Sequence, residues 1–370
     1  MSVYILELFL IWFYNILCFH STYGHNRKKL FLWLSVITLS IVLGFRANSV
    51  GEDTNHYRHM FEQAQYVSWR QIIFGGTRSV WYIDQFGFRD TVENGFLLLI
   101  KMIQIFSNNP QTMFVIIAFL TNGLMAKFIY ENTDDMFTGM YVFMCESLYM
   151  QAFNLSRQVL AIAIGIQAYK TIREKNYFKS VIIVFLAYMI HNSSVVLLLL
   201  FAIFILGRKK SLQFSRFKYL LIMGIAIPLS YSIIGDIVAR FIPRYESYFR
   251  MNYWNAQIGG GILLWILEII IIFFMYKRKF SVNVNSFTVC ACSYIYLVLE
   301  VIGLKFTAFG RIALYYRAFI LLLIPMFFAS FTDYKARKTA KVWTYILLTL
   351  FFISYARTDA RTYMFFFQKV

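Results

Sequence analysis

Arginines, carboxylates and a histidine stand at the ends of apolar segments in four places along this chain of 370 residues. The four places are Arg46 with residues 51–57, residues 154–158, His191, and Arg311 with Arg317. Several arginines that converge with one or two carboxylates and a histidine suit a site that holds a phosphate or diphosphate and moves a proton to or from a hydroxyl. We therefore expect glycosyl transfer in which a lipid-linked diphosphate is the leaving group.

Local structural roles are alternatives for three of these residues. The Arg46 side chain could extend along the preceding apolar segment and place its charge at the membrane interface. Asp53 could cap a helix over residues 55–65, with or without a catalytic role. Arg157 could simply begin a helix, although an arginine at the outer mouth of an apolar span runs against the positive-inside bias.

Structural alternatives also exist for the later positions. His191 lies in a polar break and could bond a backbone group that the break frees. Arg311 and Arg317 could form ion pairs with Glu300 or Glu268. The sequence leaves these alternatives open.

The elements that must position these residues are membrane helices. Hydrophobic residues make up 59% of the chain and charged residues only 15%, which is more apolar surface than one soluble domain of this length can bury. Lipid therefore has to be part of the solvent. The formal net charge of +18 does not indicate nucleic-acid binding, because the basic residues occur in short clusters between apolar segments.

Five basic clusters indicate which loops are cytoplasmic. They are residues 27–29, 170–179, 208–218, 277–279 and 335–341. If all five lie inside, each segment between two clusters crosses the membrane an even number of times, and the N-terminus lies outside. The loops at about 46–93, 236–261 and 303–311 are then external.

We expect an all-α fold of about 12 transmembrane helices, within a range of about 10–14, in a single membrane domain over residues 1–370. The expected spans are residues 3–18, 30–45, 113–130, 136–153, 159–169, two short helices between 179 and 208, then 219–234, 263–276, 286–301, 312–328 and 342–354. The two short helices form a hairpin whose outward tip is His191. Residues 94–106 are too few to cross the hydrocarbon core, so we expect them to form a helix at the outer interface.

Six short motifs follow one another along the chain. They are Gly44-Phe45-Arg46, Val50 to Tyr57, Glu93-Asn94-Gly95-Phe96, Asn154 to Gln158, Met189 to Ser193, and Phe309 to Ile312. Their order and spacing, between residues 30 and 325, resemble those of the EpsG-type, Wzy-like polysaccharide polymerases. Each motif is weak by itself, and the specificity lies in the set.

The resemblance implies an enzyme that polymerises oligosaccharide repeat units carried on undecaprenyl diphosphate. The reaction would take place at the outer face of the bacterial cytoplasmic membrane and would produce capsule or exopolysaccharide. The resemblance also implies a layout similar to that of GT-C glycosyltransferases, with an acidic residue in the first external loop and an interfacial helix after it. The donor and acceptor are lipid-linked oligosaccharides, and the flippase and chain-length regulator of the same pathway are further expected partners.

The motif positions carry expected roles in this reaction. The expected catalytic residues are Asp53, His191, Arg157 and Arg311, and the expected substrate-binding residues are Arg46, Glu52, Tyr57, Asn154, Gln158 and Arg317. The arginines would clamp the donor diphosphate, while Asp53 or His191 would accept the proton of the acceptor hydroxyl. Glu52 beside Asp53 departs from the motif and leaves open which carboxylate matters. We expect no metal and no other cofactor, because arginine can neutralise the leaving group and no cluster of carboxylates is available.

Other functions would use similar residues. A flippase or transporter of lipid-linked oligosaccharide would bind the same diphosphate without chemistry, but transporters tend to have two repeated halves with paired broken helices, and we find one break, at His191. A glycan ligase is too close in chemistry for the sequence to exclude. A membrane acyltransferase would need its histidine near a second acid in an inward-accessible site, whereas the expected topology places His191 outward. The sugar, the linkage and the retaining or inverting outcome depend on the shape of the pocket.

Overall fold

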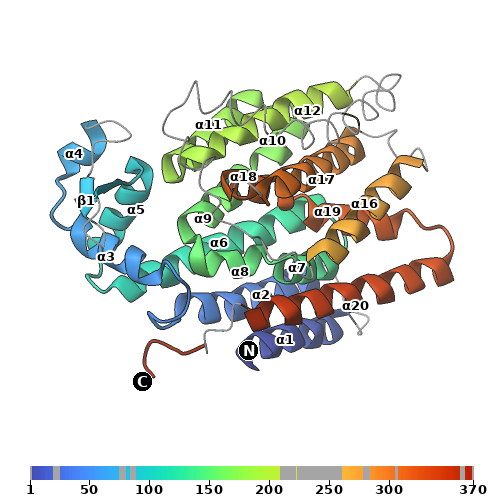
Figure 1. The fold of residues 1–370 in the computed structure, drawn as a ribbon, viewed down its shortest axis with the longest axis horizontal. Coiled ribbons are helices and arrows are strands. Elements are labelled where there is room, and N and C mark those ends of the chain that lie inside the picture. The colour runs from blue at the N-terminus through green and yellow to red at the C-terminus, as the bar shows by residue number, and fades with distance from the viewer. Residues whose placement is uncertain are drawn as a thin grey trace. The chain divides into compact units, whose positions relative to one another are not determined.

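The computed structural model describes residues 2–19, 26–74, 81–83, 89–208, 222, 261–277, 284–304, 307–358 and 363–368. The chain divides into two compact units, and each is described by itself. Unit 1 comprises residues 1–195 and 352–370, and unit 2 comprises residues 196–351. The described residues are almost entirely helical, which confirms the all-α class (Figure 1).

Unit 1 holds most of the polar motifs. Its elements are α1 (Ser2–Phe19), α2 (Asn26–Gly44), α3 (Thr54–Ala64), α4 (Trp69–Phe74), β1 (Trp81–Ile83), β2 (Arg89–Thr91), α5 (Asn94–Gln104), α6 (Pro110–Asn132), α7 (Met136–Cys145), α8 (Leu148–Asn154), α9 (Ser156–Gly165), α10 (Ala168–Arg173) and α11 (Tyr177–Ile190). The two strands pair antiparallel with Trp81 opposite Thr91. They lie in the long loop expected over residues 46–93, whose described part also contains α3 and α4.

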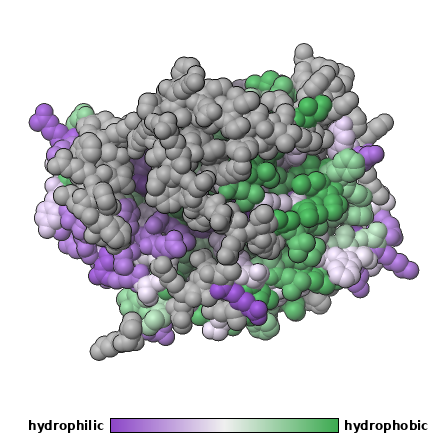
Figure 2. Space-filling view, viewed as in Figure 1, coloured by the Kyte–Doolittle hydropathy of each residue, from purple (hydrophilic) through white to green (hydrophobic). Residues whose placement is uncertain are grey.

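Unit 2 begins within a 3-10 helix, η1 (Asn192–Leu198). Its other elements are α12 (Leu199–Gly207), α16 (Gly261–Lys277), α17 (Val284–Gly303), α18 (Thr307–Arg317), α19 (Ile320–Ala329) and most of α20 (Tyr334–Thr358). Hydrophobic side chains gather on the surface that α16 and α20 present (Figure 2), where Leu263, Ile270, Phe273 and Leu350 are exposed. An exposed apolar face of this kind is the surface that lipid covers.

Several helices are suited to a membrane. Three described helices, α6, α17 and α20, are long and apolar enough to cross it, and the bent pair α18 and α19 gives a fourth span. Shorter apolar helices are found at α1, α5, α7, α11 and over η1 with α12. The chain is therefore a helical membrane protein, whereas the total of about 12 spans, the GT-C layout and the single domain stay predictions. The expected span 219–234 and the loop 236–261 lie outside the described residues, apart from Ile222 and Gly261.

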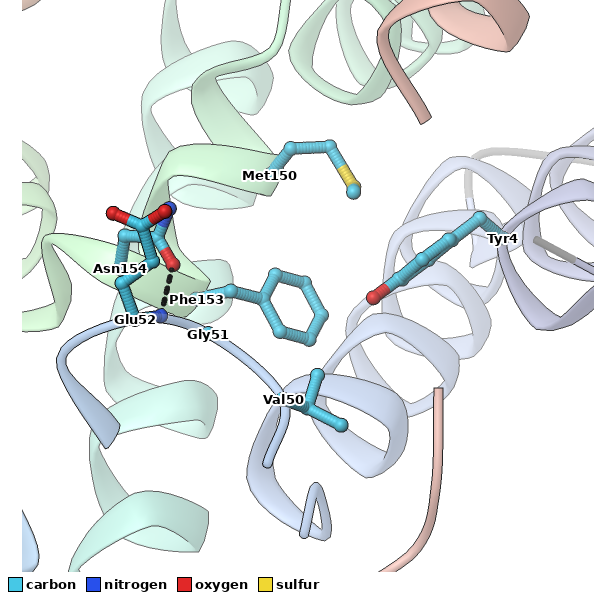
Figure 3. A pocket seen from close by; sticks show the side chains of 7 residues that line it. All are labelled: Tyr4, Val50, Gly51, Glu52, Met150, Phe153 and Asn154. Carbon is cyan, nitrogen blue, oxygen red and sulfur yellow. Dashed lines mark hydrogen bonds between the residues drawn. The ribbon is translucent and has the colours of Figure 1, made fainter. Parts of the chain in front are cut away.

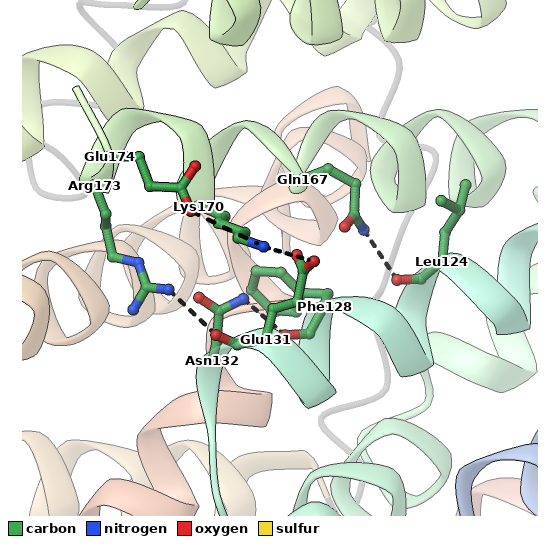
Figure 4. Close-up of polar contacts among 8 residues, drawn as sticks. All are labelled: Leu124, Phe128, Glu131, Asn132, Gln167, Lys170, Arg173 and Glu174. Carbon is green, nitrogen blue, oxygen red and sulfur yellow. Dashed lines mark hydrogen bonds and ion pairs between the residues drawn. The ribbon is translucent and has the colours of Figure 1, made fainter. Parts of the chain in front are cut away.

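The two ends of unit 1 differ in chemistry. At one end, Lys28 pairs with Asp134 at 3.3 Å, and Lys170 pairs with Glu131 at 2.9 Å. Arg173 adds a hydrogen bond to the carbonyl of Glu131 (Figure 4). Two basic clusters expected to be cytoplasmic, 27–29 and 170–179, thus meet at the C-terminal end of α6.

The polar motifs lie at the opposite end. Gln111, in the first turn of α6, donates a hydrogen bond to the carbonyl of Gly44, at the end of α2. Arg46 follows directly. Because α6 has 23 residues and a helix rises about 1.5 Å per residue, the two ends are separated by the thickness of a bilayer core. The orientation deduced from the basic clusters requires such a separation, and the orientation itself stays a prediction.

The described part of the long loop packs onto the neighbouring helices through a shared cluster of buried hydrophobic side chains. Met60 and Phe61 of α3 lie in one buried cluster with Phe96 and Ile100 of α5 and with Leu160 of α9. Met102 near the end of α5, and Ile105 and Phe106 just beyond it, are exposed and apolar. A helix of 11 residues that is buried on one side and followed by exposed apolar side chains suits the expected position at the interface.

Three expected spans are broken, and the count of a single break, at His191, is wrong. The segment 136–153 divides between α7 and α8 at Glu146 and Ser147, where Ser147 has a φ of 58°. The segment 159–169 is divided between α9, which begins earlier at Ser156, and α10. The segment 312–328 bends by 46° between α18 and α19. At the first of these breaks no Gly or Pro interrupts the sequence, so the local pattern gave no signal.

Candidate functional site

A buried carboxylate connects two of the expected catalytic residues. Glu93 Oε2 lies 2.7 Å from an Nη atom of Arg157, and Glu93 Oε1 lies 2.9 Å from Nδ1 of His191. The backbone N–H of Asn192 also donates to Oε1, at 3.1 Å. Only 8% of the Glu93 side chain is exposed, against 16% for Arg157 and 21% for His191. A single carboxylate therefore holds an arginine and a histidine that come from two different helices.

A glycine allows this approach. Glu93 is the residue directly before α5, and Gly95 lies in the first turn of that helix. A Cβ atom on Gly95 would lie 2.6 Å from both the Cβ and the carbonyl oxygen of Met189. Because no side chain stands between them, the start of α5 lies against the end of α11, within reach of His191. This contact explains the Glu-Asn-Gly-Phe motif physically.

The end of α11 presents the histidine. His191 is the C-terminal capping residue with extended backbone angles, and its N–H still bonds to the carbonyl of Ala187 at 2.9 Å. The chain continues as the 3-10 helix η1, in which the Ser194 hydroxyl bonds to the same carbonyl at 3.2 Å. The break expected at His191 is confirmed. Among the described residues, the His191 ring bonds to the Glu93 carboxylate and not to a backbone group freed by the break.

Arg157 lies in the first turn of α9. Its backbone N–H donates to the hydroxyl of Tyr57 at 3.4 Å, and its guanidinium lies 5.9 Å from the ring centre of Phe96. Tyr57 and Phe96 make an edge-to-face contact at 6.2 Å. Tyr57 of α3 and Phe96 of α5 thus both contact Arg157 and help to fix its position. The expected substrate-binding residue Gln158 follows Arg157 and is buried.

The charges of the site keep Glu93 ionised. Burial by itself would raise the pKa of the Glu93 carboxyl, but the hydrogen bond with His191, the charges of Arg157 and His191, and the Asn192 N–H together lower it below its usual value. A carboxylate that accepts several hydrogen bonds beside a cation is stable as the anion. Burial raises the pKa of the Tyr57 hydroxyl, so this group stays protonated at neutral pH.

Arg46 is buried inside the protein. Its guanidinium donates to the Leu43 carbonyl at 2.7 Å, to Thr54 Oγ1 at 3.2 Å and to Ser156 Oγ at 3.1 Å. It also lies 4.5 Å from the ring centre of Phe114. Burial lowers the pKa of Arg46 to about 10, which leaves it charged at neutral pH.

Arg46 therefore joins the end of α2 to the starts of α3 and α9, and Ser156 is the neighbour of Arg157. The interpretation in which its charge extends to the membrane interface is wrong, since only 1% of the residue is exposed. Its role in binding substrate stays a prediction. The geometry shows a residue that fixes where α9 begins.

The acidic pair of the long loop lies at the start of α3. Asp53 occupies the N-cap position, yet its side chain makes no capping hydrogen bond. Of the alternative capping role, the N-cap position is thus observed and the capping hydrogen bond is not. The backbone N–H of Glu52 donates to Oδ1 of Asn154 at 2.9 Å, which ties this turn to the end of α8. Which of the two carboxylates takes part in function stays open.

A small pocket opens beside this turn (Figure 3). It is lined by Tyr4, Val50, Gly51, Glu52, Met150, Phe153 and Asn154. Gly51 has a φ of +87°, and a Cβ atom there would lie 2.4 Å from the carbonyl oxygen of Phe153. The pocket combines two aromatic rings, from Tyr4 and Phe153, with a carboxylate and an amide at its edge. Such a combination suits the edge of a sugar.

The remaining two arginines belong to unit 2. Arg317 is buried, lies 3.5 Å from Glu300 Oε1 and lies 5.2 Å from the ring centre of Tyr296. Its structural pairing with Glu300 is thus confirmed. Arg311 lies inside α18, which begins at Thr307, so the external loop expected over 303–311 is shorter than predicted. The roles of both arginines toward substrate stay predictions.

Glu93 is the residue that the sequence did not single out. It was visible only as the first member of the Glu-Asn-Gly-Phe motif and as the last residue of the loop. Its partners lie 64 and 98 residues farther along the chain (157 − 93 and 191 − 93). Among the residues that the structure describes, no group of three or more His, Cys, Asp and Glu side chains forms a candidate metal site. The metal-free reaction stays a prediction.

The fold and the site define a class of helical membrane protein in which a carboxylate, an arginine and a histidine meet at the end of unit 1 opposite two of its basic clusters. Comparison with known families identifies the chain further. The sequence profile of the EpsG family matches residues 29–368, and the chain belongs to this family. The family is associated with polysaccharide synthesis in membranes. No curated protein and no solved structure matches the chain significantly.

Proposed function

We propose that this protein is a glycosyltransferase that polymerises oligosaccharide repeat units carried on undecaprenyl diphosphate, at the outer face of a bacterial cytoplasmic membrane. The product is capsule or exopolysaccharide. The observation that carries the proposal is the pairing of Arg157 and His191 through Glu93, at the end of unit 1 opposite two basic clusters. Arginine binds a diphosphate, and histidine accepts a proton.

The reaction exchanges one bond at the anomeric carbon. The acceptor hydroxyl oxygen forms a bond to that carbon, and the bond from the carbon to the donor diphosphate breaks. The diphosphate leaves with the bonding electrons, and a base takes the hydroxyl proton. Arg157 stabilises the charge that develops on the diphosphate, and His191 or Asp53 is the base.

The pocket of Figure 3 is the proposed place for part of the acceptor sugar. Its aromatic rings can contact the apolar face of a sugar, while the Glu52 carboxylate and the Asn154 amide can bond to hydroxyls. Both residues belong to the set expected to bind substrate. Removal of the Glu52 carboxylate should therefore weaken binding of the acceptor more than binding of the donor.

A flippase is the second candidate, and the broken helices α7–α8, α9–α10 and α18–α19 favour it more than the sequence did. Deletion of this protein separates the candidates. Loss of a polymerase leaves single repeat units on lipid at the outer face, whereas loss of a flippase leaves them at the cytoplasmic face. Loss of a ligase leaves finished polymer on lipid.

A matched pair of arginine variants tests the site itself. Arg157→Ala, returned to the deletion strain, should give single repeat units in place of polymer, because the developing charge loses its partner. Arg157→Lys should give partial activity, since lysine keeps the charge but lacks the planar pair of donors. Arg58→Ala is the control, because Arg58 is exposed and forms an exposed ion pair with Glu62 within α3. Undiminished polymer length with Arg157→Ala would remove the arginine from the mechanism.

A further inference from the structure

The carboxylate of Glu93 restricts the chemistry of His191. An ionised carboxylate can only accept hydrogen bonds, and Glu93 Oε1 lies 2.9 Å from Nδ1 of His191. The Nδ1 atom must therefore carry a proton in this contact. In the neutral imidazole the other nitrogen, Nε2, then has a free lone pair and can accept a proton.

The surroundings of Oε1 strengthen this restriction. The backbone N–H of Asn192 donates to the same oxygen at 3.1 Å, so the oxygen is fixed as an acceptor. Within the described part of the chain, the Nε2 atom of His191 makes no hydrogen bond, and the side chain is 21% exposed. The nitrogen that can take a proton is thus the one left open to a ligand.

The second oxygen of Glu93 has a different partner. Oε2 lies 2.7 Å from Arg157, so the same carboxylate sets the position of the proposed diphosphate-binding group. Because one rigid carboxylate holds both residues, the distance between the proton acceptor and the anion-binding group is fixed before a substrate binds.

We infer that Glu93 is a positioning residue that holds His191 with its proton on Nδ1, and that Nε2 of His191 is the base for the acceptor hydroxyl. This inference rests on the proposed function and selects His191 over Asp53 as the base. Glu93 itself touches no substrate in this arrangement. When Nε2 takes the hydroxyl proton, the imidazole becomes a cation, and the adjacent carboxylate stabilises its charge.

Nitrogen NMR of the full-length protein in detergent tests the position of the proton without any activity. The chain has five histidines, so a sample labelled with ¹⁵N in histidine gives few signals, and His191→Gln identifies the signal of His191. We expect a protonated Nδ1 and an unprotonated Nε2 in the wild-type protein and in Glu93→Asp. Glu93→Ala should lose this preference. An unprotonated Nδ1 in the wild-type protein would overturn the inference.

Rates measured on a lipid-linked repeat unit test the effect on catalysis. Glu93→Gln retains an oxygen that can accept from Nδ1 and from Asn192 but removes the negative charge, so it should lower kcat at least about tenfold. Glu93→Asp should restore part of the rate. Glu62→Gln is the control, because Glu62 forms an exposed ion pair on α3. An unchanged kcat in Glu93→Gln would contradict the role of the carboxylate.

The two measurements separate the inference from the proposed function. If the deletion strain accumulates no single repeat units, the proposed function fails, while the NMR result still decides the state of His191. If the units accumulate and Glu93→Gln keeps the wild-type kcat, the proposed function stands and the inference fails.

Discussion

Glu93 and His191 are 98 residues apart in sequence, and their side chains meet at 2.9 Å. The contact joins the start of α5, expected at the membrane interface, to the end of a membrane helix, α11. It exists because Gly95 lets the two backbones approach and because α11 stops at His191. The geometry of the site therefore depends on a few backbone positions as much as on its charged groups.

Substitution of Gly95 should disturb the site from a distance. Gly95→Ala places a methyl group 2.6 Å from Met189, including its carbonyl oxygen, and we expect a loss of stability of about 1–3 kcal/mol, as for an overpacked core. Polymer formation should fall as well, because α5 and α11 must separate. Thermal unfolding in detergent and polymer length in cells are the measurements.

Gly123→Ala is the matched control, since nothing lies within 4 Å of a Cβ at that position. It lies in the interior of α6, where alanine is favoured over glycine by roughly 0.5–1 kcal/mol. If Gly95→Ala and Gly123→Ala change thermal unfolding and polymer length equally, the close approach of α5 to α11 contributes neither to stability nor to activity.

Substitution of Arg46 should reduce stability. Arg46→Lys keeps the positive charge but cannot reach the Leu43 carbonyl, Thr54 and Ser156 together. Because some buried partners of the charged group would lose their hydrogen bonds, we expect the free energy of unfolding to fall on the order of 3 kcal/mol. The melting temperature in detergent measures it. Arg58→Lys, at an exposed ion pair, should leave the melting temperature unchanged.

The pKa of Glu93 predicts how stability depends on pH. Its pKa in the folded protein is lowered from an ordinary value of about 4.3. The stabilisation that follows from this shift is complete above the ordinary pKa and is lost as the pH falls through the lower pKa of the folded state. The contribution of Glu93 to the melting temperature should therefore be present in full and independent of pH near neutrality, and should be lost in strong acid.

Comparison of two variants isolates this contribution. In Glu93→Gln, the part of the acid-induced drop that belongs to Glu93 should disappear, whereas Glu62→Gln should follow the wild-type curve. If the curves of Glu93→Gln and the wild-type protein run parallel down to about pH 3, the shifted pKa of Glu93 has no influence on stability.

Labelling of engineered cysteines should place the two ends of unit 1 on opposite sides of the membrane. The four natural cysteines are all buried, so an impermeant maleimide should react only with the engineered position. Glu52→Cys, at the polar end, should react in intact cells. Glu174→Cys, beside the cluster of Lys170 and Arg173 (Figure 4), should react only after the membrane is opened. Reaction of both from the same side would refute the orientation and with it the external site.

The sequence by itself determined the membrane character, the charged ends and the elements around the site. Apolar segments, basic clusters and the polar break at His191 are local patterns, and the energetic cost of burying polar groups in lipid makes such patterns decisive. The helix after the long loop and the family followed from the same kind of information. The break between α7 and α8 did not, because Glu146 and Ser147 are buried among apolar neighbours and no Gly or Pro marks the position.

Only the tertiary structure decided which polar residues meet. Glu93, Arg157 and His191 belong to three segments, and the packing of α5 and α9 against α11 brings them together. Tertiary packing also placed Arg46, expected to bind substrate or to reach the membrane interface, in a buried network between α2, α3 and α9. Sequence patterns report which groups avoid lipid, whereas contact between groups far apart in sequence depends on how the helices pack, and that depends on side chains along their whole length.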